Sequence, residues 1–285
     1  MSPWFEAFHY GYLLKAMLAA GVVGAACGLL SCFIILKGWS LMGDALSHAV
    51  VPGVALAWIA GLPFSLGAFV AAMLAALNMG WLERRSSLRR DAIIGVVFTG
   101  YFAFGLILLS KFPSPMSLRS IVLGNLLTIS PSDLWQVMVI SGLSVAIVLM
   151  RWRDLFLCAF DPVQAAACGL NSARLQWLLL ALLSATTVAA LQAVGACLVI
   201  AMLMTPGATA RLLSDRFGCM LGLAAGSAAL CAVAGAWLSH GLNASIGGCI
   251  VLLQTLLFFV ALVLAPRRGL LAGWRARRLP TLTHS

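Results

Sequence analysis

Charged residues are scarce in this chain. Only 9% of its 285 residues are Asp, Glu, Lys or Arg, and only eight of these are acids. A soluble domain carries about 25% charged residues. Hydrophobic residues make up 62% of the chain. A water-soluble fold cannot hide that much apolar surface, so the composition excludes the soluble classes and predicts a multi-pass membrane protein.

Motifs of several other function classes are also missing. There is no GxxxxGK[ST] phosphate-binding loop, so the chain has no ATP site of that kind. Catalysis finds little support, because no GxSxG nucleophile elbow and no HExxH helix occur. The net charge of +10 comes without the aromatic and basic interleaving of a nucleic-acid surface. The eight cysteines form no CxxC, and we assign them neither a disulfide nor a thiolate metal site.

Long apolar segments follow one another along the chain. A helix needs about 20 residues to cross the hydrocarbon core of a membrane. The first segment is overlong and the seventh is short, so the sequence predicts an all-α transmembrane bundle of eight or nine helices in a single domain, 1–285. The segments lie at 10–37, 44–62, 64–83, 91–111, 134–150, 174–193, 195–210, 217–239 and 246–266.

Basic residues concentrate in alternate loops. If all nine segments cross, all but three of the 18 Lys and Arg fall on one side, the exceptions being Lys15, Lys111 and Arg119. Lys and Arg mark cytoplasmic loops, which predicts a cytoplasmic C-terminus and an external N-terminus. With eight crossings the N-terminus would be inside. The basic tail, 267–285, is cytoplasmic in both cases and could attract anionic lipid headgroups.

Two loops are long enough to have a role of their own. Residues 112–133, on the external side, mix Pro, Ser and a short apolar piece, which suggests a partly re-entrant or surface-lying segment. The internal loop contains DPVQAAACGL, in which Asp161 is a plausible N-cap, Pro162 the first helical residue and Gly169 the end. This pattern predicts a short amphipathic helix outside the bilayer, although an ordinary capped connector has the same pattern.

Asp44 is the acid with the least polar cover. The other seven acids lie at segment ends or in loops, whereas Asp44 opens an apolar segment after the short stretch KGWSLMG. Gly43 and Asp44 indicate a helix break followed by an N-cap, and discontinuous helices form ion sites at membrane depth. An ionised Asp in the bilayer core costs about 2.5–3.5 kcal/mol, so we treat this residue as a functional candidate.

Asp44 and His48 are four residues apart and share one face of a helix. A carboxylate oxygen and an imidazole nitrogen suit a borderline divalent ion such as Mn²⁺, Fe²⁺ or Zn²⁺. Ser47 could add a hydroxyl. One helix supplies too few ligands, and a symmetric dimer would supply four from two such pairs. Pro52 and Gly53 can kink the helix just beyond, which with the break at Gly43 would suit a gate.

Simpler explanations of these residues stay open. Asp44 could be a plain N-cap, and His48 could hydrogen-bond a neighbouring helix. His240 ends a span on the external side and is a candidate minor entry ligand, but capping or interfacial hydrogen bonding explains it better.

Five stretches resemble a known family, in that family's own order. GWSLMGDALSHAVVPGVALAW resembles the second-helix signature of metal-type ABC importer permeases, and RRDAIIGVVFTGYFAFGLILLS resembles their middle segment. FDPVQAAACGLNSARL is similar to their cytoplasmic coupling region. LQAVGACLVIAMLMTPGATARLLSDRFG and GGCIVLLQTLLFF resemble a late signature and the closing helix. The resemblance covers nearly the whole chain and is closest to the chelated iron/manganese branch.

The resemblance implies a type II-like ABC importer permease in the bacterial cytoplasmic membrane. Such a permease is not an enzyme and holds no permanent cofactor. It passes a divalent metal, Mn²⁺, Fe²⁺ or Zn²⁺, along its interface with a second copy of itself or a paralogous permease. Its other partners are a cytoplasmic ABC ATPase dimer and a periplasmic or extracellular metal-binding protein. Asp44 and His48 match the family's metal-pathway positions.

The coupling to the ATPase would lie in residues 151–175. There the positions that keep the family's coupling pattern are Phe160, Asp161, Pro162 and Gly169, whereas Gln164 and Cys168 depart from it. Alternative functions remain: a secondary metal/proton carrier with Asp44 and His48 as a proton relay, a permease for metal–siderophore or cobalamin cargo, and an intramembrane enzyme.

Overall fold

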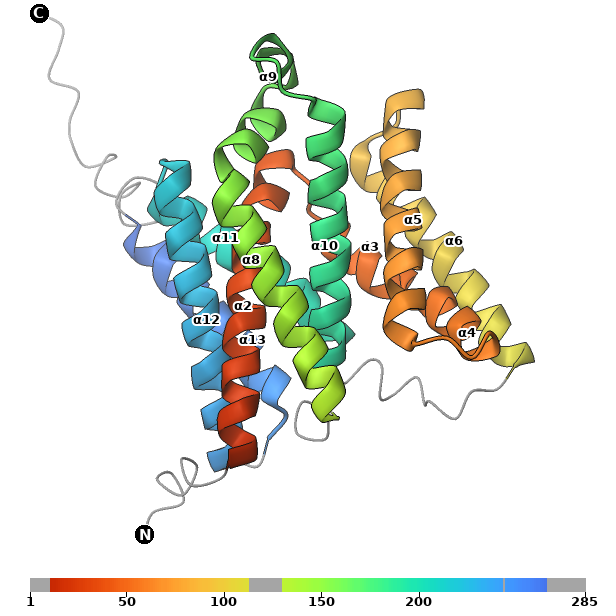
Figure 1. The fold of residues 1–285 in the computed structure, drawn as a ribbon. Helices are drawn as coiled ribbons and strands as arrows, with labels where there is room; N and C mark the ends of the chain where they lie inside the picture. Colours follow the sequence, from red (N-terminus) through yellow and green to blue (C-terminus); the bar gives the residue numbers. More distant parts are fainter. Residues whose placement is uncertain (1–10, 113–129, 243, 266–285) are drawn as a thin grey trace, which may run out of the picture.

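The computed structural model describes residues 11–112, 130–242 and 244–265 (Figure 1). Within these ranges every regular element is a helix. The helices are α2 (Gly11–Lys37), α3 (Met42–Ala49), α4 (Val51–Ile59), α5 (Phe64–Arg85), α6 (Arg90–Lys111), α8 (Pro131–Phe160), α9 (Pro162–Ala167), α10 (Ser172–Val194), α11 (Ala196–Leu213), α12 (Phe217–Leu242) and α13 (Ile246–Leu264). The prediction of an all-α membrane bundle is confirmed.

The number of crossings depends on α11. Eight helical segments are long and apolar enough to cross a membrane, if α3 and α4 count as one. The apolar part of α11, Leu198–Leu213, is shorter, yet α11 joins the end of α10 to the start of α12, which lie at opposite ends of the bundle (Figure 1). It reverses the direction of α10 at Gly195, whose φ of 88° only glycine adopts readily. In the described residues the chain therefore passes nine times between the two ends.

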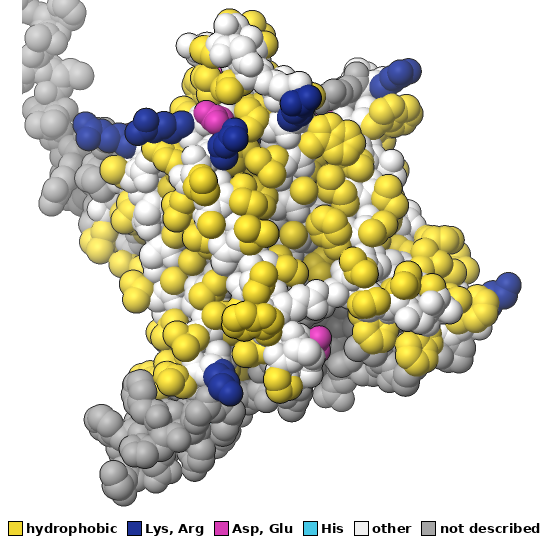
Figure 2. Space-filling model, in the orientation of Figure 1, with side chains coloured by type: hydrophobic (Ala, Val, Ile, Leu, Met, Phe, Trp, Pro, Cys, Tyr) yellow, Lys and Arg dark blue, Asp and Glu magenta, His cyan; other side chains and the backbone are white. Residues whose placement is uncertain are grey.

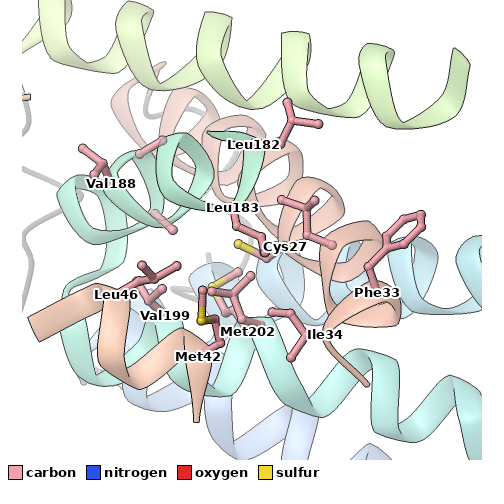
Figure 3. Packing of buried hydrophobic residues seen from close by; sticks show 14 of the residues in the cluster. Cys27, Phe33, Ile34, Met42, Leu46, Leu182, Leu183, Val188, Val199 and Met202 are labelled. Carbon is pink, nitrogen blue, oxygen red and sulfur yellow. The ribbon is translucent and has the colours of Figure 1, made fainter. Parts of the chain in front are cut away.

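The core forms around α2. This helix packs against α12 through small residues: a Cβ added at Gly28 would lie 2.5 Å from the backbone oxygen of Ala224. Small residues let helix backbones approach closely, which is the main packing device between membrane helices. Figure 3 shows that apolar side chains of α2, α3, α10 and α11 meet in one cluster, including Cys27, Leu46, Leu183 and Met202. Cys27 is buried there as a free thiol, as the apolar run around it predicts.

The two ends of the bundle differ in charge. On the face shown in Figure 2, most Lys and Arg side chains gather at the end that carries α9, with a broad apolar belt below them. We call this the α9 end. The positive-inside rule predicts that it is the cytoplasmic one.

Two predicted features lie outside the described residues. These are most of the external loop, 113–129, and the basic tail, 267–285. The re-entrant loop and the lipid-binding tail therefore stay predictions.

Candidate functional site

The candidate metal ligands follow a sharp turn at the α9 end. α2 ends at Lys37, and Gly38 has a φ of 67°. The Gly38 N–H donates to the Ile35 oxygen, and the Trp39 N–H donates to the Ile34 oxygen. These two bonds form a Schellman motif, the usual glycine-dependent end of a helix. The helix break before the ligands therefore lies at residues 38–41, which we call the α2–α3 turn.

Two sequence expectations at this point need correction. Gly43 does not break a helix, because it is the second residue of α3, and a Cβ added to it would lie 3.3 Å from the Leu203 side chain of α11. Asp44 is not an N-cap, because α3 begins two residues earlier and its cap position, Leu41, makes no side-chain bond. The helix break lies earlier in the chain, at Gly38. The Asp44 carboxylate is consequently left available for another role.

The second interruption falls where the sequence predicts it. α3 ends at Ala49 and α4 begins at Val51, with Pro52 in its first turn. Proline has no N–H to donate to the carbonyl four residues earlier, which is that of His48. The helix is thus interrupted directly after the second candidate ligand.

Gly53 makes a close backbone contact rather than an open joint. A Cβ on Gly53 would collide with the backbone oxygen of Gly67 in α5. On the other side, a Cβ on Gly105 of α6 would lie 2.9 Å from the backbone nitrogen of Pro52. These glycines let α4 lie tightly between α5 and α6. A gate or hinge role for Gly43, Pro52 and Gly53 stays a prediction.

The two candidate ligands face each other. The Asp44 Oδ1 lies 3.3 Å from the His48 Nε2, and the side chains are 35% and 26% exposed in the single chain. Metal–oxygen and metal–nitrogen bonds of about 2.0–2.2 Å at a tetrahedral angle place two ligand atoms about 3.4 Å apart. The observed separation therefore suits one divalent ion held by both atoms.

The imidazole is fixed from α6. The ring centroid of His48 lies 5.4 Å from that of Phe98 and 5.4 Å from that of Phe102. These phenylalanines stand 8 and 12 residues after the first residue of the 22-residue α6. At 1.5 Å per residue they lie about 12–18 Å along a helix of about 33 Å. The His48 ring thus lies beside the middle part of α6.

Ser47 and His240 do not join the pair within one chain. The Ser47 hydroxyl is buried and donates to the Gly43 oxygen at 2.8 Å, so it points back into its own helix. His240 lies in the last turn of α12, which packs mainly on α2, α13 and α11. In the described part of the chain, no group of three or more His, Cys, Asp and Glu residues comes together. One chain therefore offers two ligands.

The predicted helix in the internal loop is present. The Asp161 carboxylate accepts the N–H groups of Val163 and Gln164, each at 3.0 Å, and Pro162 is the first residue of α9. Gly169 ends the unit with a φ of 78°. The N-cap, the proline and the terminal glycine are confirmed as the sequence predicts.

The short helix projects from the bundle (Figure 1). Only Ala165 of α9 is buried. Two large apolar side chains beside it are open to solvent, since Phe160 is 69% and Val163 is 80% exposed. Phe160 and Val163 thus form an exposed apolar surface, which we call the α9 knob. Such a surface beyond the membrane-spanning region is typical of a docking site for another protein.

Sequence reasoning missed the aromatic support of His48. Phe98 and Phe102 are four residues apart, so both rings lie on one face of α6. That spacing could have indicated a shared contact, but nothing in the sequence pairs that face with α3.

Comparison with known proteins identifies the family to which the chain is similar. The family model described as "ABC 3 transport family" matches residues 9–265. The chain is 50% identical over 274 residues to the chelated iron transport system membrane protein YfeC of Yersinia pestis, covering 96% of this chain and 93% of that one. It is 46% identical over 276 residues to the manganese transport system membrane protein MntB of Synechocystis sp., covering 96% and 90%. The solved structure of PsaBC from Streptococcus pneumoniae in complex with Fab superposes with a TM-score of 0.82 at 35% identity, covering 92% of this chain and 95% of that one.

Proposed function

Because the chain belongs to the ABC 3 transport family, we propose that it is the membrane-spanning permease subunit of an ATP-driven importer of divalent transition metal ions. The observation that carries the proposal is the Asp44–His48 pair, which lies within a membrane-spanning segment between two helix interruptions. Transporters place ion sites where helices are broken, because unwound backbone is tolerated only around a cavity.

The cargo follows from the relatives and from the ligand types. Relatives with 46–50% identity are named for manganese and chelated iron transport. One carboxylate oxygen and one imidazole nitrogen suit Mn²⁺ and Fe²⁺, and also Zn²⁺. The preferred cargo is Mn²⁺ or Fe²⁺, with Zn²⁺ permitted by the chemistry alone.

A second permease copy would complete the site. Divalent transition metals take four or more ligands, and each chain offers two. Two copies related by a two-fold axis along the path would supply two carboxylates and two imidazoles. Asp44 and His48 are both partly exposed in the single chain, as residues of such an interface must be. The partner copy is either identical or a paralogous permease.

The remaining partners follow from the two ends of the bundle. A cytoplasmic ATPase would receive the α9 knob formed by Phe160 and Val163, which Asp161 fixes through the helix cap. ATP hydrolysis would take place on that separate chain. An external metal-binding protein would dock at the opposite end. The whole assembly would lie in the bacterial cytoplasmic membrane, with the α9 end and the C-terminus cytoplasmic.

Transport would proceed by alternating access. The binding protein delivers the ion, Asp44 and His48 hold it briefly, and closure of the ATPases pulls α9 and reshapes the path. The ligand set must be modest in strength, because a very tight site would trap the ion. The interruption at Pro52 allows α3 and α4 to move separately during the cycle.

The test measures uptake of ⁵⁴Mn²⁺ and ⁵⁵Fe²⁺ by cells that carry the complete transporter. Asp44→Ala and His48→Ala should abolish uptake while the permease remains in the membrane at its normal level. Full uptake by both variants would overturn the assignment of Asp44 and His48 as metal ligands. Uptake that survives an inactive partner ATPase but collapses with an uncoupler would instead indicate a secondary carrier. Transport of a siderophore or cobalamin complex in preference to the bare ion would change the cargo.

A further inference from the structure

Arg90 joins three helices at the α9 end. It is the first residue of α6, and its Nε lies 2.5 Å from the Glu83 Oε1 of α5. Its Nη1 also donates to the backbone oxygen of Lys37, the last residue of α2, at 2.8 Å. The rigid guanidinium fork can hold two such partners at once, which an ammonium group on a flexible stem cannot do as well.

The bond to Lys37 has a specific electrostatic reason. The last carbonyl groups of a helix have no partner within the helix and carry its negative partial charge. The Schellman bonds of Gly38 and Trp39 use the oxygens of Ile35 and Ile34, not that of Lys37. Arg90 brings a positive charge and an N–H group to this oxygen.

The neighbouring residue makes a second link to the same turn. The Ser40 hydroxyl donates to the Asp91 Oδ1 at 3.1 Å. Consecutive residues of α6 therefore hold both sides of the α2–α3 turn, Lys37 before Gly38 and Ser40 after it. We call the contacts of Arg90 and Asp91 with Glu83, Lys37 and Ser40 the turn clamp.

The turn clamp lies close in sequence to the Asp44–His48 pair. Ser40 stands two residues before the first residue of α3 and four before Asp44. A small cavity under the clamp is lined by Trp39, Met42, Glu83, Arg90 and Ile94, among others, and thus by the turn, α3, α5 and α6. The clamp therefore fixes the start of α3 against α5 and α6 between the pair and the α9 end.

The clamp is weak enough to open. The Arg90 and Glu83 side chains are 56% and 27% exposed, and ion pairs that water reaches contribute little to stability. An ion pair that served only to stabilise the fold would be expected deeper in the bundle. A weak, reversible contact suits a turn that must move in each transport cycle.

We propose that Arg90 is a positioning residue for the candidate ligands Asp44 and His48. Arg90 holds the α2–α3 turn on α5 and α6 and so closes the α9 end of the metal path. Release of the turn lets α3 shift and opens the path from Asp44 and His48 towards that end. The proposal deepens the proposed function and rests on it for the nature of the cargo. The movement itself can be tested without any metal.

The first experiment reports the movement. Ser40→Cys and Asp91→Cys are combined in the complete transporter, and disulfide formation is followed by gel mobility, with each single variant as a control for the native cysteines. We expect the disulfide to form and to stop uptake, and reduction to restore it. Adding Arg90→Ala should slow disulfide formation by about fivefold, as expected for loss of a partly exposed charged contact. An unchanged rate without Arg90, or full uptake with the disulfide formed, would overturn the proposal.

The second experiment separates positioning from folding. Arg90→Ala and Glu83→Gln should each lower the rate of Mn²⁺ uptake per permease molecule, with Arg90→Lys intermediate. Arg89→Ala is the matched control, because its side chain forms no ion pair or hydrogen bond with any described residue. Normal uptake per molecule with less protein in the membrane would show a purely structural role and overturn the proposal. Failure of the unmodified transporter to carry Mn²⁺ or Fe²⁺ would remove the proposed cargo, while the disulfide rates would still judge the clamp.

Discussion

The imidazole of His48 lies 5.4 Å from the ring of Phe98, and this contact joins α3 to α6. Phe102, on the same face of α6, lies equally close to the imidazole, and the two phenyl rings restrict the rotamers that it can adopt. Phe98→Ala should release the ring and lower metal uptake by about threefold to tenfold, the cost of ordering a side chain again at each binding event. Uptake kinetics in cells would measure the effect. Phe98→Leu, which keeps most of the apolar bulk, should retain most of the activity. Equal losses in both variants would assign the contact to packing alone.

Substitution of Asp44 should abolish metal uptake, whereas substitution of Ser47 should change it little. Asp44→Asn keeps the shape and one oxygen but removes the negative charge that attracts a cation, so uptake should fall close to background. Ser47→Ala should leave uptake within about twofold, because the hydroxyl is already bonded to the Gly43 oxygen and its loss costs little. Both variants are assayed for uptake at matched membrane levels. Loss of uptake in Ser47→Ala would make that hydroxyl a ligand after all.

The glycine contact between α4 and α5 should be sensitive to a single methyl group. A Cβ on Gly67 would lie 2.6 Å from the Ala57 Cβ and even closer to the Gly53 oxygen, so Gly67→Ala must push the two helices apart. Overpacking of this kind costs about 1–3 kcal/mol. We expect a lower thermal midpoint of the purified protein and reduced uptake. Gly80→Ala in the same helix is the control, because a Cβ there meets no described atom within 4 Å. A drop of similar size in Gly80→Ala would show that the loss does not come from the close contact between α4 and α5.

The sequence predicted most of the fold and the contact between Asp44 and His48, because the signals for both are local. Apolar runs specify membrane helices, and the four-residue spacing of Asp44 and His48 puts them on one face wherever their helix begins. The start of that helix could not be predicted in the same way. Two glycines, Gly38 and Gly43, were available for the break, and either satisfies the backbone rules. The choice depends on tertiary contacts: Gly43 is needed inside α3 to approach Leu203, and Arg90 stabilises the turn at Gly38.

The α9 cap should be necessary for coupling. Asp161→Ala removes the acceptor of two N–H bonds and costs the helix about 0.5–2 kcal/mol. The exposed knob should then lose its fixed shape, so uptake and co-purification of the partner ATPase should both decrease. Asp161→Asn is the matched control, since asparagine caps a helix about as well. If Asp161→Asn lost as much uptake as Asp161→Ala, the charge rather than the cap would be the requirement.

Replacing Gln254 of α13 by an apolar residue should stabilise the protein. Its amide oxygen and nitrogen are both buried, and neither has a hydrogen-bond partner among the described residues. The adjoining cavity, lined by Thr205, Thr209 and Ser227, is too small for a water molecule. Leaving such groups unpaired costs about 1–3 kcal/mol, and methionine has a similar length without the polar atoms. Gln254→Met should therefore raise the thermal midpoint of the purified permease.

The reverse result would be equally informative about Gln254. Ser227→Ala provides the comparison, because Ser227 already donates to the Ala224 oxygen and its removal should change the midpoint little. If Gln254→Met lowered the midpoint, the amide would have a partner in the protein as purified. If it raised the midpoint but slowed uptake, the amide would find its partner only in another state of the cycle, with the hydroxyls of Thr205 and Thr209, which line the same cavity, as candidates. An amide that destabilises the resting state but forms a hydrogen bond in another state of the transport cycle would explain why this polar side chain lies within an apolar helix.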